Sequence, residues 1–331
     1  MSKIYITRKI TDTAIKALKK AGHKVSMYPH SDRQIPRKEL LKNIKGCDAV
    51  LTLLTEKVDA EFFKAAGKQL KVVANYAVGF DNIDLKAAKQ YDVKIGNTPC
   101  EEVNEAVSEA SMTMMLALAT QIVNADAFTK AGKYKTWDPM IFTGPSLVGK
   151  TLGIIGAGRI GGGLAHRAKE GFGIKIVYNN PQRNPEFEKM YGAKFMTKEQ
   201  LLKVSDFVSL HVPLLASTRH LISTKEFKLM KKTAYLINTA RGPVVDEKAL
   251  ILALKRNQIA GAALDVYENE PALDADPSDN ISLRDKDIIN KLIMTPHTAS
   301  ATIEAREKMA QIASGNIINA LKGKKMISEV V

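Results

Sequence analysis

A short glycine-rich stretch places the strongest limit on how this chain can fold. Residues 151–161 read TLGIIGAGRIG, an apolar strand that runs into the pattern G-x-G-x-x-G and then into a helical pattern. In such a loop Gly156 makes the tight turn, Gly158 lets backbone N–H groups approach a pyrophosphate, and Gly161 allows close helix–strand packing. The positive end of the helix then faces the phosphates. Strand, spacing and helix together predict a dinucleotide-binding βαβ unit.

Short β-rich runs alternate with helical patterns along the 331 residues, in one series from residue 3 and a second from residue 151. Alternation of this kind is typical of parallel sheets covered by helices on both faces. Two series predict an α/β chain with two Rossmann/flavodoxin-like doubly wound parallel-sheet domains and a cleft between them. The strands are expected at Lys3–Ile6, Asp48–Leu53, Leu70–Asn75 and Val93–Ile95, and then at Thr151–Ile155, Ile174–Tyr178, Lys194–Met196, Phe207–Val212, Ala234–Asn238, Gly261–Val266 and Leu292–Thr295.

Two long helical patterns mark where the chain passes between the predicted domains. Residues Glu101–Asn124 read as one continuous helix, with acidic residues early, where they suit the helix dipole. Residues Thr302–Leu321 form a second pattern that carries the chain back. We therefore expect a discontinuous domain of residues 1–99 plus 300–331 and a dinucleotide-binding domain of residues 100–299.

The composition of the chain limits which binding partners and which cellular compartment are expected. The net charge is +14, but the basic residues form no long run, so a solvated surface that attracts small anions is favoured over nucleic-acid binding. No apolar run approaches the roughly 20 residues of a membrane helix, and the N-terminus has no signal-peptide pattern. The two cysteines, Cys47 and Cys100, exclude a disulfide framework and favour the cytoplasm.

Residues 132–149 lack clear periodicity and include Trp137, the single tryptophan of the chain. A mobile loop is one interpretation of this segment. The other, which we favour, is an ordered excursion that makes the contact of a homodimer.

The end of the second strand in a dinucleotide-binding domain distinguishes NAD from NADP. An NAD-preferring site places Asp or Glu there, about 20 residues on, to bind the ribose 2′-hydroxyl. This chain has Asn179 and Asn180, which can bond a ribose or phosphate oxygen, and no acid before Glu186. Arg183 either neutralises a 2′-phosphate or is a solvated loop charge. Because a carboxylate would repel that phosphate, its absence predicts NADP(H) as the preferred cofactor, with NAD(H) as the alternative.

Three polar segments follow later strands, at the edge where ligands collect in open α/β sheets, and supply Arg241, Glu270 and His297. Hydride addition to a keto acid leaves negative charge on oxygen, which requires a proton donor and an electrostatic clamp. Arg241 suits the substrate carboxylate, His297 suits proton delivery, and Glu270 on the other ring nitrogen would favour the imidazolium. Each also has a structural interpretation, as a surface charge, a loop acid or a buried histidine. His211 is the alternative acid, and no metal site is expected.

With the glycine loop, these segments match in order and spacing the D-isomer-specific 2-hydroxyacid dehydrogenase family, which the chain resembles over essentially its whole length. The resemblance implies that Arg241 binds substrate, that His297 is the acid/base, and that Glu270 orients and charges it. It also implies that the discontinuous domain binds substrate and that Asp265 contacts the nicotinamide carboxamide. The other implied cofactor contacts are Gly156, Gly158, Arg159, Ile160, Gly161, Asn179, Asn180, Arg183, Val212, Pro213, Thr239 and Ala240.

Residues 53–59 and 75–84 look most like the glyoxylate/hydroxypyruvate reductase branch. In that branch the Val78 and Gly79 amides would bind the substrate carboxylate beside Leu53, and Ser300 would lie near the catalytic histidine. Cys100 departs from the family, which usually has glycine there, and this puts the entry to the following helix in doubt. Phosphoglycerate, D-lactate and phosphite dehydrogenases stay open as alternatives, as does a dinucleotide-sensing binding protein.

Overall fold

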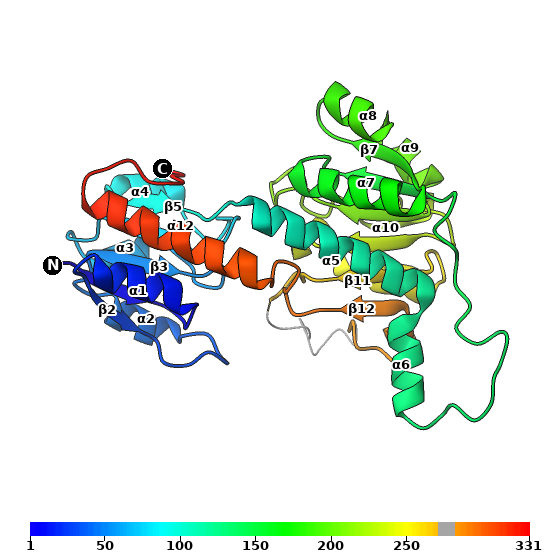
Figure 1. Ribbon diagram of the computed structural model, residues 1–331, viewed down its shortest axis with the longest axis horizontal. Coiled ribbons are helices and arrows are strands. Elements are labelled where there is room, and N and C mark those ends of the chain that lie inside the picture. Colours follow the sequence, from blue (N-terminus) through cyan, green and yellow to red (C-terminus); the bar gives the residue numbers. More distant parts are fainter. Residues whose placement is uncertain (271–281) are drawn as a thin grey trace. The chain divides into compact units, whose positions relative to one another are not determined.

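A computed structural model describes residues 1–270 and 282–331 of the chain. It divides into two compact units, each built on its own parallel sheet (Figure 1). Unit 1 contains Met1–Val103 and Ala301–Val331, and unit 2 contains Asn104–Ser300. The prediction of two doubly wound α/β folds is confirmed by the strand order of each sheet.

Unit 1 alternates strands and helices and ends on a long helix. Its elements are β1 Lys3–Ile6, α1 Asp12–Lys20, β2 Lys24–Met27, α2 Arg37–Asn43, β3 Ala49–Thr52, α3 Ala60–Ala66, β4 Val72–Asn75, α4 Leu85–Gln90, β5 Lys94–Gly96 and α12 Ile303–Leu321. The parallel sheet has the strand order β2-β1-β3-β4-β5, which is the flavodoxin-like order. Helices α2, α3 and α4 pack on one face, and α1 packs against α12 on the other.

Unit 2 repeats the alternation on a larger scale. Its elements are α5 Glu101–Thr120, which begins in unit 1, α6 Ile122–Lys130, β6 Thr151–Ile155, α7 Arg159–Phe172, β7 Lys175–Asn179, α8 Pro185–Tyr191, β8 Lys194–Phe195, α9 Lys198–Val204, β9 Phe207–Leu210, α10 Thr224–Leu229, β10 Tyr235–Asn238, η1 Gly242–Val244, α11 Glu247–Lys255, β11 Gly261–Leu264, η2 Ile289–Lys291 and β12 Leu292–Met294. The parallel sheet has the strand order β12-β11-β10-β9-β6-β7-β8. Counted from β6, this is the Rossmann order extended by one edge strand.

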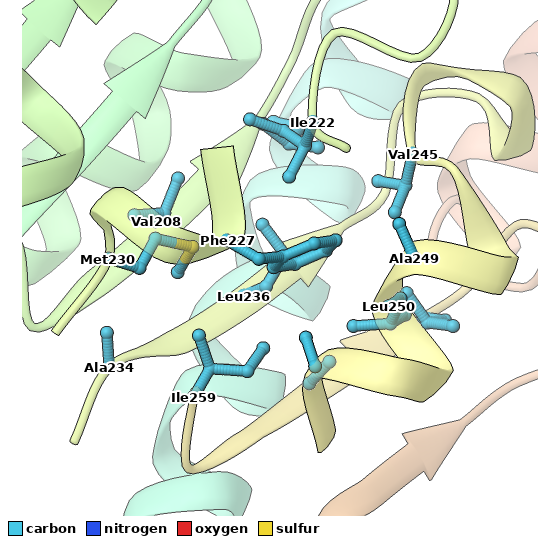
Figure 2. Close-up of a cluster of buried hydrophobic side chains, with 14 of the residues drawn as sticks. Val208, Ile222, Phe227, Met230, Ala234, Leu236, Val245, Ala249, Leu250 and Ile259 are labelled. Carbon is cyan, nitrogen blue, oxygen red and sulfur yellow. The ribbon is translucent and has the colours of Figure 1, made fainter. Parts of the chain in front are cut away.

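Neighbouring side chains on the strands of unit 2 enter different cores. Leu236 of β10 packs with α9, α10 and α11, whereas Ile237 packs with α5, α7 and α8. Figure 2 shows the first of these cores, in which Phe227 and Leu250 lie near Leu236. Burial of each such side chain contributes about 1.5–3 kcal/mol, so packing on both faces stabilises the sheet.

The prediction of one continuous helix over Glu101–Asn124 is wrong. Helix α5 ends at Thr120, Gln121 takes a left-handed φ of 55°, and α6 departs at 64°. The Gln121 side chain donates to the Leu118 carbonyl at 3.1 Å and so satisfies a group that the helix would otherwise leave open. The backbone at Gly144 also lies against the Ala119 carbonyl oxygen, which a Cβ at residue 144 would approach to 1.8 Å. Tertiary contacts therefore end α5 where the apolar pattern continues.

Cys100 immediately precedes α5. The helix starts at Glu101 although residue 100 is not the glycine that is usual in the family. Within residues 1–270 and 282–331, no single helix is long and apolar enough to cross a membrane, and α5 with α6 meets that test only as a bent pair.

Candidate active site

The glycine-rich loop lies between β6 and α7. Gly156 has a φ of +98°, and a Cβ there would lie 2.7 Å from the His211 backbone. A Cβ on Gly161 would lie 2.6 Å from the Gly156 carbonyl oxygen, so these two glycines are needed for packing. Gly158 is the N-cap of α7, and a Cβ on it would meet open space. The space before this helix N-terminus therefore fits a pyrophosphate bound by backbone N–H groups.

This difference predicts opposite results for two alanine substitutions in one loop. Gly158→Ala should fold normally but weaken dinucleotide binding about tenfold, because the methyl group occupies the space that a phosphate needs. Gly156→Ala should lower the free energy of unfolding by about 1–3 kcal/mol, since φ is positive and the methyl group meets the His211 backbone. Calorimetric titration and thermal unfolding measure the two effects. Unchanged affinity in Gly158→Ala would remove this loop from the cofactor site.

The end of β7 supports the glycine loop. Asn180 accepts a hydrogen bond from the Ala157 amide on Oδ1 at 2.7 Å, and Asn179 donates to the Met196 carbonyl at 2.7 Å. Arg183 forms two hydrogen bonds of 2.7 Å with Glu188, and this pairing holds the pKa of Glu188 down at about 2. Arg183 is thus paired with Glu188, and its side chain is 66% exposed.

The other expected cofactor contacts follow strands of the same sheet. Val212 and Pro213 come after β9, and Thr239 and Ala240 come after β10. The Thr239 hydroxyl lies 2.9 Å from the Ser111 hydroxyl of α5. Arg159 and Ile160 form the first turn of α7, where Arg159 is exposed and the Ile160 carbonyl accepts from Ser108.

Arg241 lies in a tight turn after β10. The buried Asn238 side chain accepts from the Ala240 amide at 3.1 Å and donates to the Arg241 carbonyl at 3.0 Å. The Arg241 guanidinium donates to the Ala240 carbonyl at 2.8 Å. The Asn238 side chain thus binds backbone groups of both Ala240 and Arg241, and this fixes the direction of the backbone at Arg241.

Glu270 and His297 are paired although 27 residues separate them. Nδ1 of His297 lies 2.7 Å from Glu270 Oε2, and Glu270 Oε1 accepts from the Tyr267 amide at 2.9 Å. With Nδ1 engaged, Nε2 is the ring nitrogen left to face a substrate. His297 has a left-handed φ of 56°, which non-glycine residues adopt rarely and which is concentrated at functional sites.

Asp265 holds the His297 loop. Its buried carboxylate accepts from the Thr295 hydroxyl at 2.5 Å and from the Thr298 and Ala299 amides at 2.8 Å. These three bonds surround residue 297 on both sides and stabilise its unusual backbone. The structure thus shows a loop-supporting role for Asp265, and Ser300 follows directly as the last residue of unit 2.

His211 is a poorer candidate for the acid. Its Nε2 lies 2.9 Å from the Ser209 hydroxyl, and its Nδ1 is buried without a hydrogen-bond partner in the described part of the chain. Burial lowers the pKa of His211 to about 4. A histidine with so low a pKa lacks the acidic imidazolium proton near pH 7.

The expected substrate contacts of unit 1 lie in two loops at the carboxyl ends of β3 and β4. The Leu53 amide donates to Glu56 Oε2 at 2.6 Å. The Val78 carbonyl accepts from Asn97 and the Gly79 carbonyl accepts from Asn75. Within residues 1–270 and 282–331, nothing accepts a hydrogen bond from the Val78 or Gly79 amide, so both donors are available to an anion.

A polar network around the buried Asn75 and the half-buried Asn82, neither of which was predicted as a site residue, shapes these two loops. Asn82 donates to the carbonyls of Leu53 and Glu56, and it lies 3.1 Å from Asn75, which holds Gly79. The signal in the sequence was an Asn at a strand end, as also at Asn238 in unit 2. Such residues commonly bond to nearby backbone in turns.

The structure brings Arg241, Glu270, His297 and the glycine loop onto the sheet of unit 2, and places Leu53, Val78 and Gly79 in unit 1. Each set lies at the carboxyl edge of its sheet, where ligands bind in doubly wound folds.

The chain is similar to known proteins in both sequence and fold. Residues 112–299 match the family described as D-isomer specific 2-hydroxyacid dehydrogenase, NAD binding domain. A glyoxylate reductase of Thermococcus litoralis is 45% identical over 325 residues, which cover 97% of this chain and 94% of that protein.

Two solved structures are similar over the whole chain. The TT0316 protein of Thermus thermophilus has a TM-score of 0.89 and 35% identity, covering 99% of this chain and 100% of that one. D-lactate dehydrogenase of Escherichia coli has a TM-score of 0.84 and 28% identity, with full coverage of both chains. The chain is thus an oxidoreductase that binds a nicotinamide dinucleotide and acts on a 2-keto or 2-hydroxy acid, and it belongs to the D-isomer specific 2-hydroxyacid dehydrogenase family.

Proposed function

We propose that the chain reduces a small 2-keto acid, glyoxylate or hydroxypyruvate first among them, to the D-2-hydroxy acid. The observation that carries this proposal is the hydrogen bond between Glu270 and His297 at the edge of a dinucleotide-binding sheet. An imidazole held by a carboxylate on Nδ1 presents Nε2 as a proton donor. We place glyoxylate first among the substrates because a glyoxylate reductase is 45% identical to this chain over 97% of its length.

Each residue then has a defined task. The glycine loop at Gly156, Gly158 and Gly161 would hold a nicotinamide dinucleotide, which would supply the hydride. His297 donates the proton on Nε2 to the carbonyl oxygen, so that C=O becomes CH–OH. Glu270 accepts from Nδ1 and stabilises the imidazolium that exists before the transfer. Arg241 binds the substrate carboxylate through two parallel N–H···O bonds and offsets the charge that develops on oxygen.

The two units divide the ligands between them in this proposal. Unit 2 serves as the dinucleotide-binding domain, and its bounds, Asn104–Ser300, contain the matched family region. Unit 1 serves as the substrate-binding domain, with the available Val78 and Gly79 amides for the carboxylate and Leu53 beside them. Ser300 is assigned to the substrate contacts because it follows the His297 loop.

We propose NADPH as the preferred cofactor. Support comes from residues 179–185, which contain no carboxylate to bind a ribose 2′-hydroxyl or to repel a 2′-phosphate. Arg183 lies in this segment, and it would exchange one of its bonds to Glu188 for the phosphate. NADH is the weaker cofactor in this proposal.

Steady-state kinetics with glyoxylate, hydroxypyruvate, pyruvate and 3-phosphohydroxypyruvate, each with both cofactors, tests the proposal. We expect the highest kcat/KM with glyoxylate or hydroxypyruvate and NADPH, and Arg183→Ala should raise the KM for NADPH more than that for NADH. A higher kcat/KM with NADH contradicts the cofactor assignment. A preference for pyruvate would favour the activity named for the E. coli structure. Tight NADPH binding without turnover of any 2-keto acid would favour a sensor.

A homodimer is proposed from the segment that follows α6. Trp137, Met140 and Val148 are 75%, 72% and 73% exposed, which is unusual for three large apolar side chains within twelve residues. Light scattering on the purified protein should give about twice the chain mass of 36.3 kDa. Trp137→Glu should shift the mass toward that of one chain, whereas Met190→Glu, on exposed α8, should not. Monomeric wild-type protein would contradict the proposal.

We also propose that the protein works in the cytoplasm, because Cys47 and Cys100 are both free thiols.

A further inference from the structure

Two turns that carry proposed catalytic residues are joined by a reciprocal pair of glutamates. One turn runs from Arg241 to Glu247, at the start of α11, and the other from Tyr267 to Glu270. The Glu268 amide donates to Glu247 Oε1 at 2.5 Å, and the Glu247 amide donates to Glu268 Oε2 at 3.2 Å. Each glutamate therefore binds the backbone of the opposite turn.

Two further contacts bring the same turns together. Gly242 lies against the second turn so closely that a Cβ would approach the Tyr267 carbonyl oxygen to 1.8 Å. His220 bonds to both turns, since its amide donates to the Pro243 carbonyl at 2.8 Å and its Nε2 lies 2.5 Å from Glu268 Oε1. The backbones are thus in direct contact, and side chains lock them from two sides.

The charges at this junction argue against a role in packing alone. Burial raises the pKa of Glu247, and the nearby carboxylates of Glu268 and Glu270 raise it further. Carboxylates that crowd in this way repel one another, and apolar side chains would join two turns with less cost to folding. What the glutamates provide instead is directional bonding between the segments that bear Arg241 and Glu270.

We propose that Glu247 and Glu268 are positioning residues that lock the Arg241 turn to the Glu270 turn. The lock keeps the substrate-binding guanidinium and the Glu270–His297 pair in one geometry, and the inference rests on the roles proposed above for those residues. The Tyr267 amide completes the path, because it holds the Glu270 carboxylate from within the second turn. An error of about 1 Å in such a geometry costs roughly 100-fold in rate.

The test compares Glu247→Ala with Glu247→Gln, which keeps an acceptor oxygen for the Glu268 amide. Glu247→Ala should lower kcat by roughly 10- to 100-fold with little change in the Kd for NADPH, and Glu247→Gln should restore kcat to within about threefold of wild type. Glu199→Ala, in the first turn of α9, is the matched control and should leave kcat unchanged. Amide hydrogen exchange at Glu268 should speed up in Glu247→Ala only.

A double-mutant cycle separates action through Glu270 from a general loss of structure. In a Glu270→Gln background, Glu247→Ala should lower kcat by much less than it does in wild type. Full additivity, or wild-type kcat in Glu247→Ala, would overturn the proposal. If Glu247→Ala does not fold, His220→Ala removes a bond to the same lock and should lower kcat severalfold; wild-type kcat there counts against the lock. Activity retained by His297→Ala would instead contradict the proposed function, independently of these variants.

Discussion

Replacing His297 by alanine is expected to lower kcat by about 10²- to 10⁴-fold, because proton transfer from a positioned side chain contributes a factor of that size. The loss should fall on the chemical step, since the imidazole is bonded to Glu270 and supports neither the glycine loop nor the sheet. The Kd for NADPH should therefore stay close to that of wild type. Single-turnover kinetics and calorimetric titration measure the two quantities separately.

His166→Ala is the matched control, since this histidine is exposed on α7 and should be replaceable without effect on kcat. Glu270→Gln should give an intermediate loss, because an amide still accepts a hydrogen bond but no longer stabilises the imidazolium by charge. A His297→Ala enzyme with wild-type kcat would refute the acid/base role, and His211, whose pKa is lowered to about 4 by burial, is a poor substitute for it.

Arg241→Ala is expected to lower kcat/KM by at least about 100-fold, mainly through a higher KM for the keto acid and partly through kcat. Charge-assisted hydrogen bonds to a carboxylate contribute about 1.5–3 kcal/mol each, and a guanidinium forms two of them in parallel. The fold should be unaffected, because Asn238 holds the turn through backbone atoms that alanine retains. Initial rates over a range of keto-acid concentrations check this expectation.

Two further variants test whether Arg241 binds the substrate through its guanidinium group. Arg241→Lys keeps the charge but not the planar fork, so it should recover only part of the lost kcat/KM. Arg256→Ala, at the exposed end of α11, removes an arginine from the same unit and should leave kcat/KM unchanged. If Arg241→Ala keeps wild-type kcat/KM, this residue does not bind substrate.

The strands that the sequence revealed most clearly are those buried on both faces. In β6, β9 and β10 apolar residues follow one another with little interruption, because each face of the sheet has its own core. β2 was not anticipated, since Lys24–Met27 is only half buried and lies at the sheet edge, where polar and apolar residues mix. The bend at Gln121 was missed for a related reason: a long apolar pattern predicts a helix but not the contact that ends it.

For the candidate site, the sequence indicated which residues to consider but not what each of them contacts. The absence of a carboxylate after β7 was visible in the sequence, but the pairing of Arg183 with Glu188 was not. That Asp265 contacts the nicotinamide stays a prediction, and its hydrogen bonds to the His297 loop were not visible in the sequence. Glu247 and Glu268 were not among the predicted site residues, and only the folded chain placed them on opposite turns.

The glycine-rich stretch illustrates the difference between what the sequence determines and what the tertiary structure decides. By itself the sequence determined that a strand, a tight turn and a helix follow one another at residues 151–172, because glycine spacing and apolar periodicity act within a few residues of the chain. Only the tertiary structure decided that Gly156 lies against the His211 backbone while Gly158 faces open space. It likewise paired Glu270 with His297 and joined the turns of Arg241 and Glu270. Those contacts depend on how parallel strands stack side by side, which brings together residues that sequence patterns treat as unrelated.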